Sequence, residues 1–398
     1  MKKLRCMAVG LAVAIVFTAT PIYASAASIT LLPYLAERDL DDNTRVLTLE
    51  EAFRMAERNN SSIDMLNDSL RFIEQQRRSL QIDADNAWRF GQGRQDFSAE
   101  AARRAIRSID MTIGTAPTNI QIMETTSRFL VLSTLNTIRS NEMDLILLRE
   151  TVALQTVALS HAELRNSLGV ASDADVTSAR QDLESSRAMM RTLEIGLSSQ
   201  RASLNYILGL PSDADIYVER EIQLEAGDIS DRVRNIHYYA DRQIVTDPSI
   251  AVLRRQLADA QVNYDMAENW LQNTHPTPPG MPFNPQTNPT DRASMLNALN
   301  SASRELRDSI DSMRENILQA YNQLRQLEER RATLLIDLRR AHDIYDNAVV
   351  SLAAGVITEH EVNSARLAIL NAEAAIIENA LAYEIRSFAF DSPFLLGG

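Results

Sequence analysis

The sequence predicts an all-α fold: an elongated coiled-coil bundle of long helices, built as two repeats with little or no β-structure. Three observations predict it. Apolar residues recur every three or four positions over long stretches, glycine and proline number only 12 each in 398 residues, and one turn sequence occurs twice. Because so few residues interrupt the helical pattern, we expect segments much longer than ordinary globular helices.

The longest pattern covers Asp291–Ala353. Its positions advance by alternating steps of four and three, and Arg331 is the only charged member: Leu306, Ile310, Met313, Ile317, Ala320, Leu324, Leu327, Arg331, Leu334, Leu338, Ala341, Tyr345, Ala348 and Leu352. A mean step of 3.5 residues is the coiled-coil period, which predicts left-handed supercoiling with neighbouring helices. A helix of this span would be roughly 90–95 Å long, too long for a single globular core.

Three further helices follow the same spacing. Their apolar positions are Leu135, Ile138, Leu145, Leu148, Val152 and Leu159; Leu183, Met190, Leu193, Leu197, Leu204 and Leu208; and Val362, Ala365, Ile369, Ala372, Ile376, Ala380 and Tyr383. The second of these ends at Gly209-Leu210-Pro211, where a glycine stop precedes a proline that cannot continue the helix.

The two halves align with each other. Residues 169–180 match residues 355–366 with six identities, and Asn60-Ser61-Ser62-Ile63 matches Asp247-Pro248-Ser249-Ile250. A long, constant offset with matching helix boundaries indicates a structural duplication. We therefore predict a first hairpin repeat at 27–210, a linker at 211–246, a second repeat at 247–390 and a tail at 391–398.

The duplicated segment predicts a tight turn between two helices. Gly169 and Gly355 suit a left-handed cap on the incoming helix. Ser172 with Asp175, and Thr358 with Glu361, have the spacing of a capping box that opens the outgoing helix. The simplest role of these carboxylates is helix capping and compensation of the helix dipole.

Residues 1–26 have the features of a secretory signal peptide. Lys2, Lys3 and Arg5 precede a short apolar run over 7–20, and Ala24-Ser25-Ala26 offers a cleavage site before Ala27. A retained N-terminal anchor is the alternative. The only cysteine, Cys6, lies in the predicted signal peptide, so the mature chain would have neither disulfides nor thiolate chemistry.

The charge balance excludes one class of partner. The chain carries 40 basic and 53 acidic residues, a net charge of −13, and removal of residues 1–26 makes it −16. Such an acidic chain is a poor nucleic-acid binder, because phosphate contacts need surplus Lys and Arg. The balance fits a protein outside the cytoplasm or a passage that attracts cations.

No motif predicts an enzyme. The five histidines (His161, His237, His275, His342 and His360) have no metal-binding spacing, and the sequence contains no phosphate-binding glycine loop or nucleophile elbow. We therefore expect no catalytic residue, no cofactor and no metal site.

Several motifs together resemble the TolC-like outer-membrane efflux protein family. They are residues 47–52 (LTLEEA) with 57–60 (ERNN), the two glycine turns, and the helix end at 204–211 (LNYILGLP). The resemblance covers about residues 45–390. It implies a trimer whose long helices form a hollow barrel, with the repeat turns at a periplasmic entrance that acidic residues line.

The resemblance assigns candidate entrance and turn residues. These are Gly169, Asp173, Asp175, Gly355, Glu359 and Glu361, with Asp175 and Glu361 where the family places acidic residues. Three positions depart from the pattern: Ser364 is not acidic, and Ile357 and Leu352 replace the Arg and Tyr that latch the entrance in well-known members. That latch is therefore not expected here.

The resemblance also implies two membrane strands in each repeat, and the sequence lacks them. A membrane strand needs roughly 9–11 alternating residues. Gly91–Phe97 is too short, Asn273–Thr290 contains six prolines, and a weak alternation over Met111–Ile122 is interrupted by Gly114 and Pro117. We expect the helical barrel portion without these strands. Trp88 and Trp270 border the two interruptions, either as interfacial anchors or as caps of the bundle core.

The predicted function is that of an extracytoplasmic conduit subunit in an efflux or export assembly. We expect a homotrimer at the periplasm, outer membrane or cell surface, with a periplasmic adaptor and an inner-membrane transporter as the implied partners. Membrane association is compatible with this prediction, although no spanning segment is seen. The alternative is an extracytoplasmic coiled-coil scaffold or adaptor that conducts nothing.

Overall fold

The computed structural model describes residues 44–90, 97–220, 222, 224, 228–272 and 289–397. The predicted signal peptide (residues 1–26) and most of the two predicted interruptions (91–96 and 273–288) lie outside these residues. The side chains of Trp88 and Trp270 also lie outside the described part.

The structure consists mainly of long helices, as predicted. The first half contains β1 (Arg45–Thr48), α2 (Leu49–Arg58), α3 (Ser61–Phe90), α4 (Phe97–Ser167) and α5 (Asp173–Ile207). The middle segment contains β2 (Ile216–Glu219), α6 (Ile229–Arg232) and α7 (Ile236–Thr246). The second half contains α8 (Pro248–Gln272), α9 (Pro289–Ala353), α10 (Glu359–Asp391) and a 3₁₀ helix, η2 (Pro393–Gly397).

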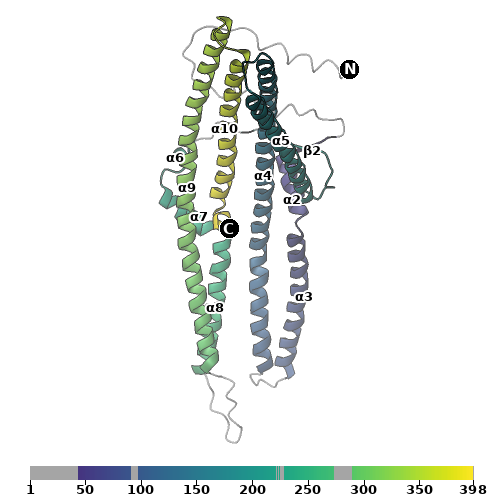
Figure 1. The fold of residues 1–398 in the computed structure, drawn as a ribbon. Coiled ribbons are helices and arrows are strands. Elements are labelled where there is room, and N and C mark those ends of the chain that lie inside the picture. Colours follow the sequence, from purple (N-terminus) through teal and green to yellow (C-terminus); the bar gives the residue numbers. More distant parts are fainter. Residues whose placement is uncertain are drawn as a thin grey trace, which may run out of the picture.

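The helices form an elongated layer around two long members, α4 with 71 residues and α9 with 65 residues (Figure 1). Two shorter helices lie end to end along α4, namely α3 and α5, and two lie along α9, namely α8 and α10. Since α8 and α10 also contact α4, the order across the layer is α3–α4–α8–α9 at one end and α5–α4–α10–α9 at the other. Within the described residues α9 makes no extensive contact with α3 or α5, so the layer has two open edges.

The predicted seam of α9 is confirmed in its central part. Ile317 and Leu324 are fully buried, and Met313, Ala320, Leu338 and Ala341 are nearly so. The helix bounds agree with the predicted Asp291–Ala353 to within two residues. The spacing therefore identified both the helix and its contact face.

The alternation over Met111–Ile122 does not form a strand. This stretch is helical, and α4 continues through both Gly114 and Pro117. Proline removes one backbone donor, but a helix of 71 residues retains many bonds on either side. Thr115 Oγ1 donates to the Thr112 carbonyl at 3.1 Å, which adds a bond in the turn before the proline.

A short parallel β-pair closes the first half. β1 pairs with β2, with Arg45 opposite Ile216 and Thr48 opposite Glu219. Leu47 and Val218 are buried in the core beside α4. Thr48 then caps α2 through a capping box with Glu51, in which Thr48 N–H donates to Glu51 Oε2 at 2.8 Å. Four-residue strands agree with the expectation of little β-structure.

The helices α3 and α8, whose first residues align in the predicted duplication, begin alike. Asn60 Oδ1 accepts a hydrogen bond from Ser62 N–H at 3.0 Å, and Asp247 Oδ1 accepts one from Ser249 N–H at 2.8 Å. The duplication and its boundaries remain predictions, although this match fits them. In the predicted tail, η2 follows α10 and packs against α9.

Candidate functional site

The candidate residues lie at the two hairpin tips, which we define as residues 168–175 between α4 and α5 and residues 354–361 between α9 and α10. Both tips lie at the same end of the layer (Figure 1). Gly169 has a φ of 73° and Gly355 a φ of 70°, so both adopt the left-handed conformation that glycine tolerates.

Each incoming helix ends in a Schellman motif. Val170 N–H donates to the Arg165 carbonyl at 2.8 Å and Val356 N–H donates to the Ser351 carbonyl at 2.9 Å. Gly169 and Gly355 each donate to the carbonyl three residues earlier, both at 2.9 Å. These bonds satisfy carbonyls that a helix end otherwise leaves unpaired.

Each outgoing helix begins with the predicted capping box. Ser172 N–H donates to Asp175 Oδ2 at 2.8 Å, and Thr358 N–H donates to Glu361 Oε2 at 2.7 Å. The hydrogen bonds from Ser172 and Thr358 lower the pKa of the Asp175 and Glu361 carboxyls respectively. Within one chain, then, both carboxylates are used for capping and favour the charged form.

The other candidate residues have different surroundings. Asp173 accepts a hydrogen bond from Asn166 Nδ2 at 2.9 Å, which links it to the end of α4. Glu359 is exposed in the first turn of α10. No interaction within the chain tests the role of these residues at an entrance, so that role remains a prediction.

The tips carry apolar side chains as well as charges. Leu168 and Val170 at the first tip and Val356 at the second are exposed. Leu352, where the family has a latch residue, is only 36% exposed, and Ile357 is half-buried. The ends of both hairpins therefore combine acidic helix starts with apolar turns.

Two contacts between α4 and α10 hold the hairpins together near the tips. Arg366 Nη2 lies 2.5 Å from Glu150 Oε2, and the rings of His161 and His360 have centroids 6.5 Å apart. Sequence spacing did not predict either contact, because each one joins residues about 200 positions apart.

A polar groove of about 700 Å³ runs between α4, α9 and α10. All three helices contribute to its lining. The lining side chains are mostly polar or charged: Ser133, Asn136, Thr137, Ser140, Asn141, Gln323, Gln326, Arg330, Glu378 and Arg386, with Leu327, Leu381, Ala382 and Ile385. Burial raises the pKa of Glu378, as does the neighbouring Asp144.

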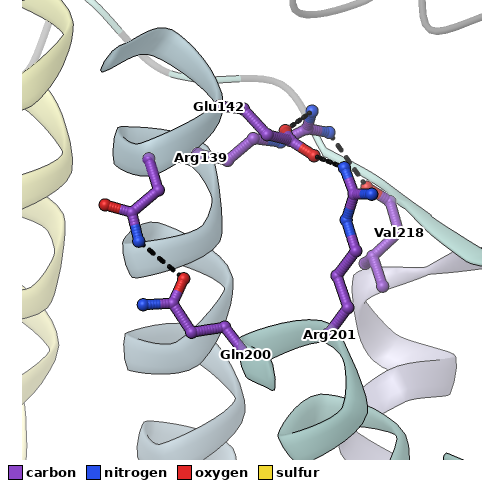
Figure 2. Close-up of polar contacts among 6 residues, drawn as sticks. Arg139, Glu142, Gln200, Arg201 and Val218 are labelled. Atoms are coloured by element: carbon purple, nitrogen blue, oxygen red, sulfur yellow. Dashed lines mark hydrogen bonds and ion pairs between the residues drawn. The ribbon is translucent and has the colours of Figure 1, made fainter. Parts of the chain in front are cut away.

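A carboxylate shared by two arginines anchors the segment that follows the first repeat (Figure 2). Glu142 accepts from Arg139 at 3.1 Å and from Arg201 at 2.8 Å. The Arg139 guanidinium also lies over the Tyr217 ring, 5.0 Å from its centroid. Thus Arg139 attaches β2 to α4, and Glu142 joins α4 to α5, by interactions that sequence spacing did not reveal.

Arg220, directly after β2, joins the two halves of the chain. It forms an ion pair with Glu384 on α10 and donates to Asn136 Oδ1 on α4 at 2.6 Å. Asn136 in turn donates to the Leu381 carbonyl at 3.0 Å. Burial lowers the pKa of Arg220 to about 10, with a further contribution from Arg139. We name Arg220, Glu384 and Asn136 the arginine clasp.

Two other observations concern membrane-spanning helices and metal ions. No helix in the described part of the chain has the long, charge-poor apolar run needed to cross a membrane. Among the described residues, no three His, Cys, Asp or Glu side chains gather closely enough to hold a metal ion.

The fold defines a class: two long helical hairpins side by side in an open layer, with both tips at one end. No protein-family model matches the chain, and no curated protein matches its sequence. Solved structures do match. A membrane protein from Pseudomonas aeruginosa is 13% identical, with a TM-score of 0.64 over 88% of this chain and 93% of that one.

Two named outer membrane proteins match similarly. The outer membrane protein VceC from Vibrio cholerae is 12% identical, with a TM-score of 0.60 over 88% of this chain and 96% of that chain. The Campylobacter jejuni outer membrane channel CmeC is 12% identical, with a TM-score of 0.61 over 96% of this chain and 91% of that chain. The chain has the fold of TolC-like outer-membrane efflux proteins, and the resemblance indicated by its motifs is confirmed at the level of fold.

Proposed function

We propose that this chain is the conduit-forming subunit of an efflux or export assembly outside the cytoplasmic membrane. Three copies would join edge to edge into a hollow helical barrel. A periplasmic adaptor and an inner-membrane transporter are the partners that this fold suggests.

The open edges of the layer carry this proposal. On α3, Met65 and Phe72 are seven residues apart, so they lie on the same side of the helix, and Phe72 is 67% exposed. On α9, Ile336 and Ile344 are exposed in the half of the helix that packs against α10, where α5 forms the other edge of the layer. Large apolar side chains on two unpaired helix edges favour a second coiled-coil seam with another copy.

An open layer closes only if its first and last helices meet. Since α9 makes no extensive contact with α3 or α5 in the part of the chain that the structure describes, the edges can pair between chains and enclose a space. The polar groove between α4, α9 and α10 would then suit a wall facing water, because its charged and amide side chains remain hydrated. In the same assembly the two tips of each chain would gather at one end of the barrel.

The mass of the mature chain in solution tests the proposal. Sedimentation equilibrium should give a trimer for residues 27–398. Charged substitutions on the α3 edge, Met65→Glu with Phe72→Glu, should shift it to a monomer, because they put six carboxylates into the three new seams. The matched control is Asn67→Glu, which adds a charge at an exposed position on another side of α3.

The outcomes separate the two candidate functions. A trimer that survives the double substitution would contradict the edge-to-edge arrangement. A monomer at all concentrations of the unaltered chain would instead favour the scaffold alternative, which needs no enclosed space.

A further inference from the structure

The contact between the two hairpins changes along its length. Near its middle, α4 and α10 share a core in which Met143 and Ile377 are fully buried, and Asn136 of the arginine clasp bonds to the Leu381 carbonyl. From residue 146 to the end of α4 no residue is buried. The hairpins are thus firmly joined at the middle and lightly joined toward their tips.

Two contacts between ionisable groups join α4 and α10 in this lightly packed half. The first is the ion pair between Glu150 and Arg366, and the second, nearer the tips, is the edge-to-face contact of His161 with His360. Among the described residues, His360 Nδ1 is buried and has no hydrogen-bond partner. Histidine is the side chain whose ordinary titration falls between pH 5 and 8.

We propose that His161 and His360 form a pH-sensitive contact that keeps the two hairpin tips of one chain together when the imidazoles are neutral and releases them when both are protonated. The arginine clasp would keep α4 and α10 joined near their middle while the tips separate. The inference rests on the contact alone and does not require the chain to form a conduit.

Repulsion between the two protonated imidazoles would drive the hairpin tips apart. Two neutral rings with centroids 6.5 Å apart attract each other weakly, whereas two imidazolium ions at this separation repel. His360 is also the second residue of α10, where the positive end of the helix dipole opposes a further positive charge. Because no buried apolar residue of α4 lies beyond Leu145, little packing opposes separation there.

Most of the charged groups around the two rings are engaged in helix caps or ion pairs. On α10, Glu359 and Glu361 flank His360, and the Glu361 carboxylate, which Thr358 holds in the capping box, attracts a protonated His360. On α4 and α5, Glu163 is paired with Arg180 at 3.2 Å, and Asp175, near Arg165, caps α5. On α9, the last nine residues before the tip contain Tyr345 and Asp346 as their only titratable groups.

Distances between spin labels test the proposal. Nitroxides at Ala174→Cys and Ala354→Cys, both exposed at the tips, report the separation, and the mature chain has no cysteine of its own beyond the predicted signal peptide. Labelled protein is diluted with unlabelled protein so that distances within one chain dominate. Between pH 7.5 and pH 5.5 the short-distance population should fall about twofold or more.

Histidine variants identify the source of the change. His161→Gln should abolish it, and this substitution does not endanger the fold because His161 is exposed. His342→Gln, at another histidine in the same half of the hairpin, should leave it intact. An unchanged distance in the native chain between pH 7.5 and 5.5, or an equal change in His161→Gln, would overturn the proposal. Either result would leave the trimer of the proposed function standing.

Discussion

Asn59 lies directly against Gly209, at the junction between the end of α2 and the end of α5. Its Nδ2 donates to the Tyr206 carbonyl at 2.8 Å and to the Ile207 carbonyl at 3.2 Å. A Cβ on Gly209 would lie only 2.7 Å from Asn59 Oδ1. Gly209 therefore serves both as a left-handed helix cap and as the space that admits Asn59.

Replacing four glycines by alanine, one at a time, should separate the cost of the left-handed conformation from the cost of displacing Asn59. Gly169→Ala and Gly355→Ala, where φ is positive but the space is open, should each cost about 1 kcal/mol in the free energy of unfolding. Gly209→Ala should cost about 2–3 kcal/mol, because it also displaces Asn59 from its hydrogen bonds. Gly196→Ala, inside α5 with nothing nearby, should stabilise the chain by about 0.5–1 kcal/mol. Urea unfolding measures the series, and an equal cost at 169 and 209 would argue against the Asn59 contact.

The capping boxes should make the tips sensitive to acid. The pKa of Asp175 is lowered from 3.8 and that of Glu361 from 4.5, so their stabilisation is present above these unfolded values and is lost as pH falls through the lower folded values. The double variant Asp175→Asn with Glu361→Gln should show a flatter fall in thermal midpoint below about pH 4.5. Asp173→Asn with Glu359→Gln is the control, since neither residue closes a capping box. Identical acid profiles for native and capping variants would refute this account.

Removal of Arg220 should weaken the joint between the two halves. Its side chain is 8% exposed and that of Glu384 is 38% exposed, so Arg220→Met leaves a partly solvated carboxylate and an unsatisfied Asn136 oxygen. We expect a cost of about 2–3 kcal/mol in the free energy of unfolding. Arg187→Met breaks an exposed pair with Glu184 and should cost about 0.5 kcal/mol or less. Comparable losses for the two variants would show that burial of Arg220 has no energetic effect.

Tyr383 should lose its phenolic proton at a higher pH than an ordinary tyrosine does. Burial raises its pKa to about 12, with help from Glu328, which accepts its hydroxyl hydrogen bond at 3.0 Å. Since the folded value lies above the unfolded value of 10.0, this stabilisation is present below pH 10 and is lost as pH rises toward 12. The ultraviolet difference titration of native protein against Tyr383→Phe should isolate one phenol with this late midpoint. A difference curve centred near pH 10 would disagree with the burial of Tyr383.

The amino-acid sequence by itself determined the long helices and the geometry of the two tips. Both features are local: the 3.5-residue spacing gives the contact face of α9, and Gly169 with the Ser172–Asp175 box defines a turn within a few residues. The sequence did not predict that α4 continues through Gly114 and Pro117. The many backbone hydrogen bonds of this long helix outweigh the local effect of one glycine and one proline.

Only the tertiary structure decided which distant residues meet. β1 and β2 are too short for alternation to reveal them, and they pair only because the chain returns along α4 after α5. The contacts of Arg220 with Glu384, Asn59 with Gly209, and His161 with His360 each join residues more than 140 positions apart. Such contacts depend on how the helices lie side by side in the layer, which the periodicity of one helix does not specify.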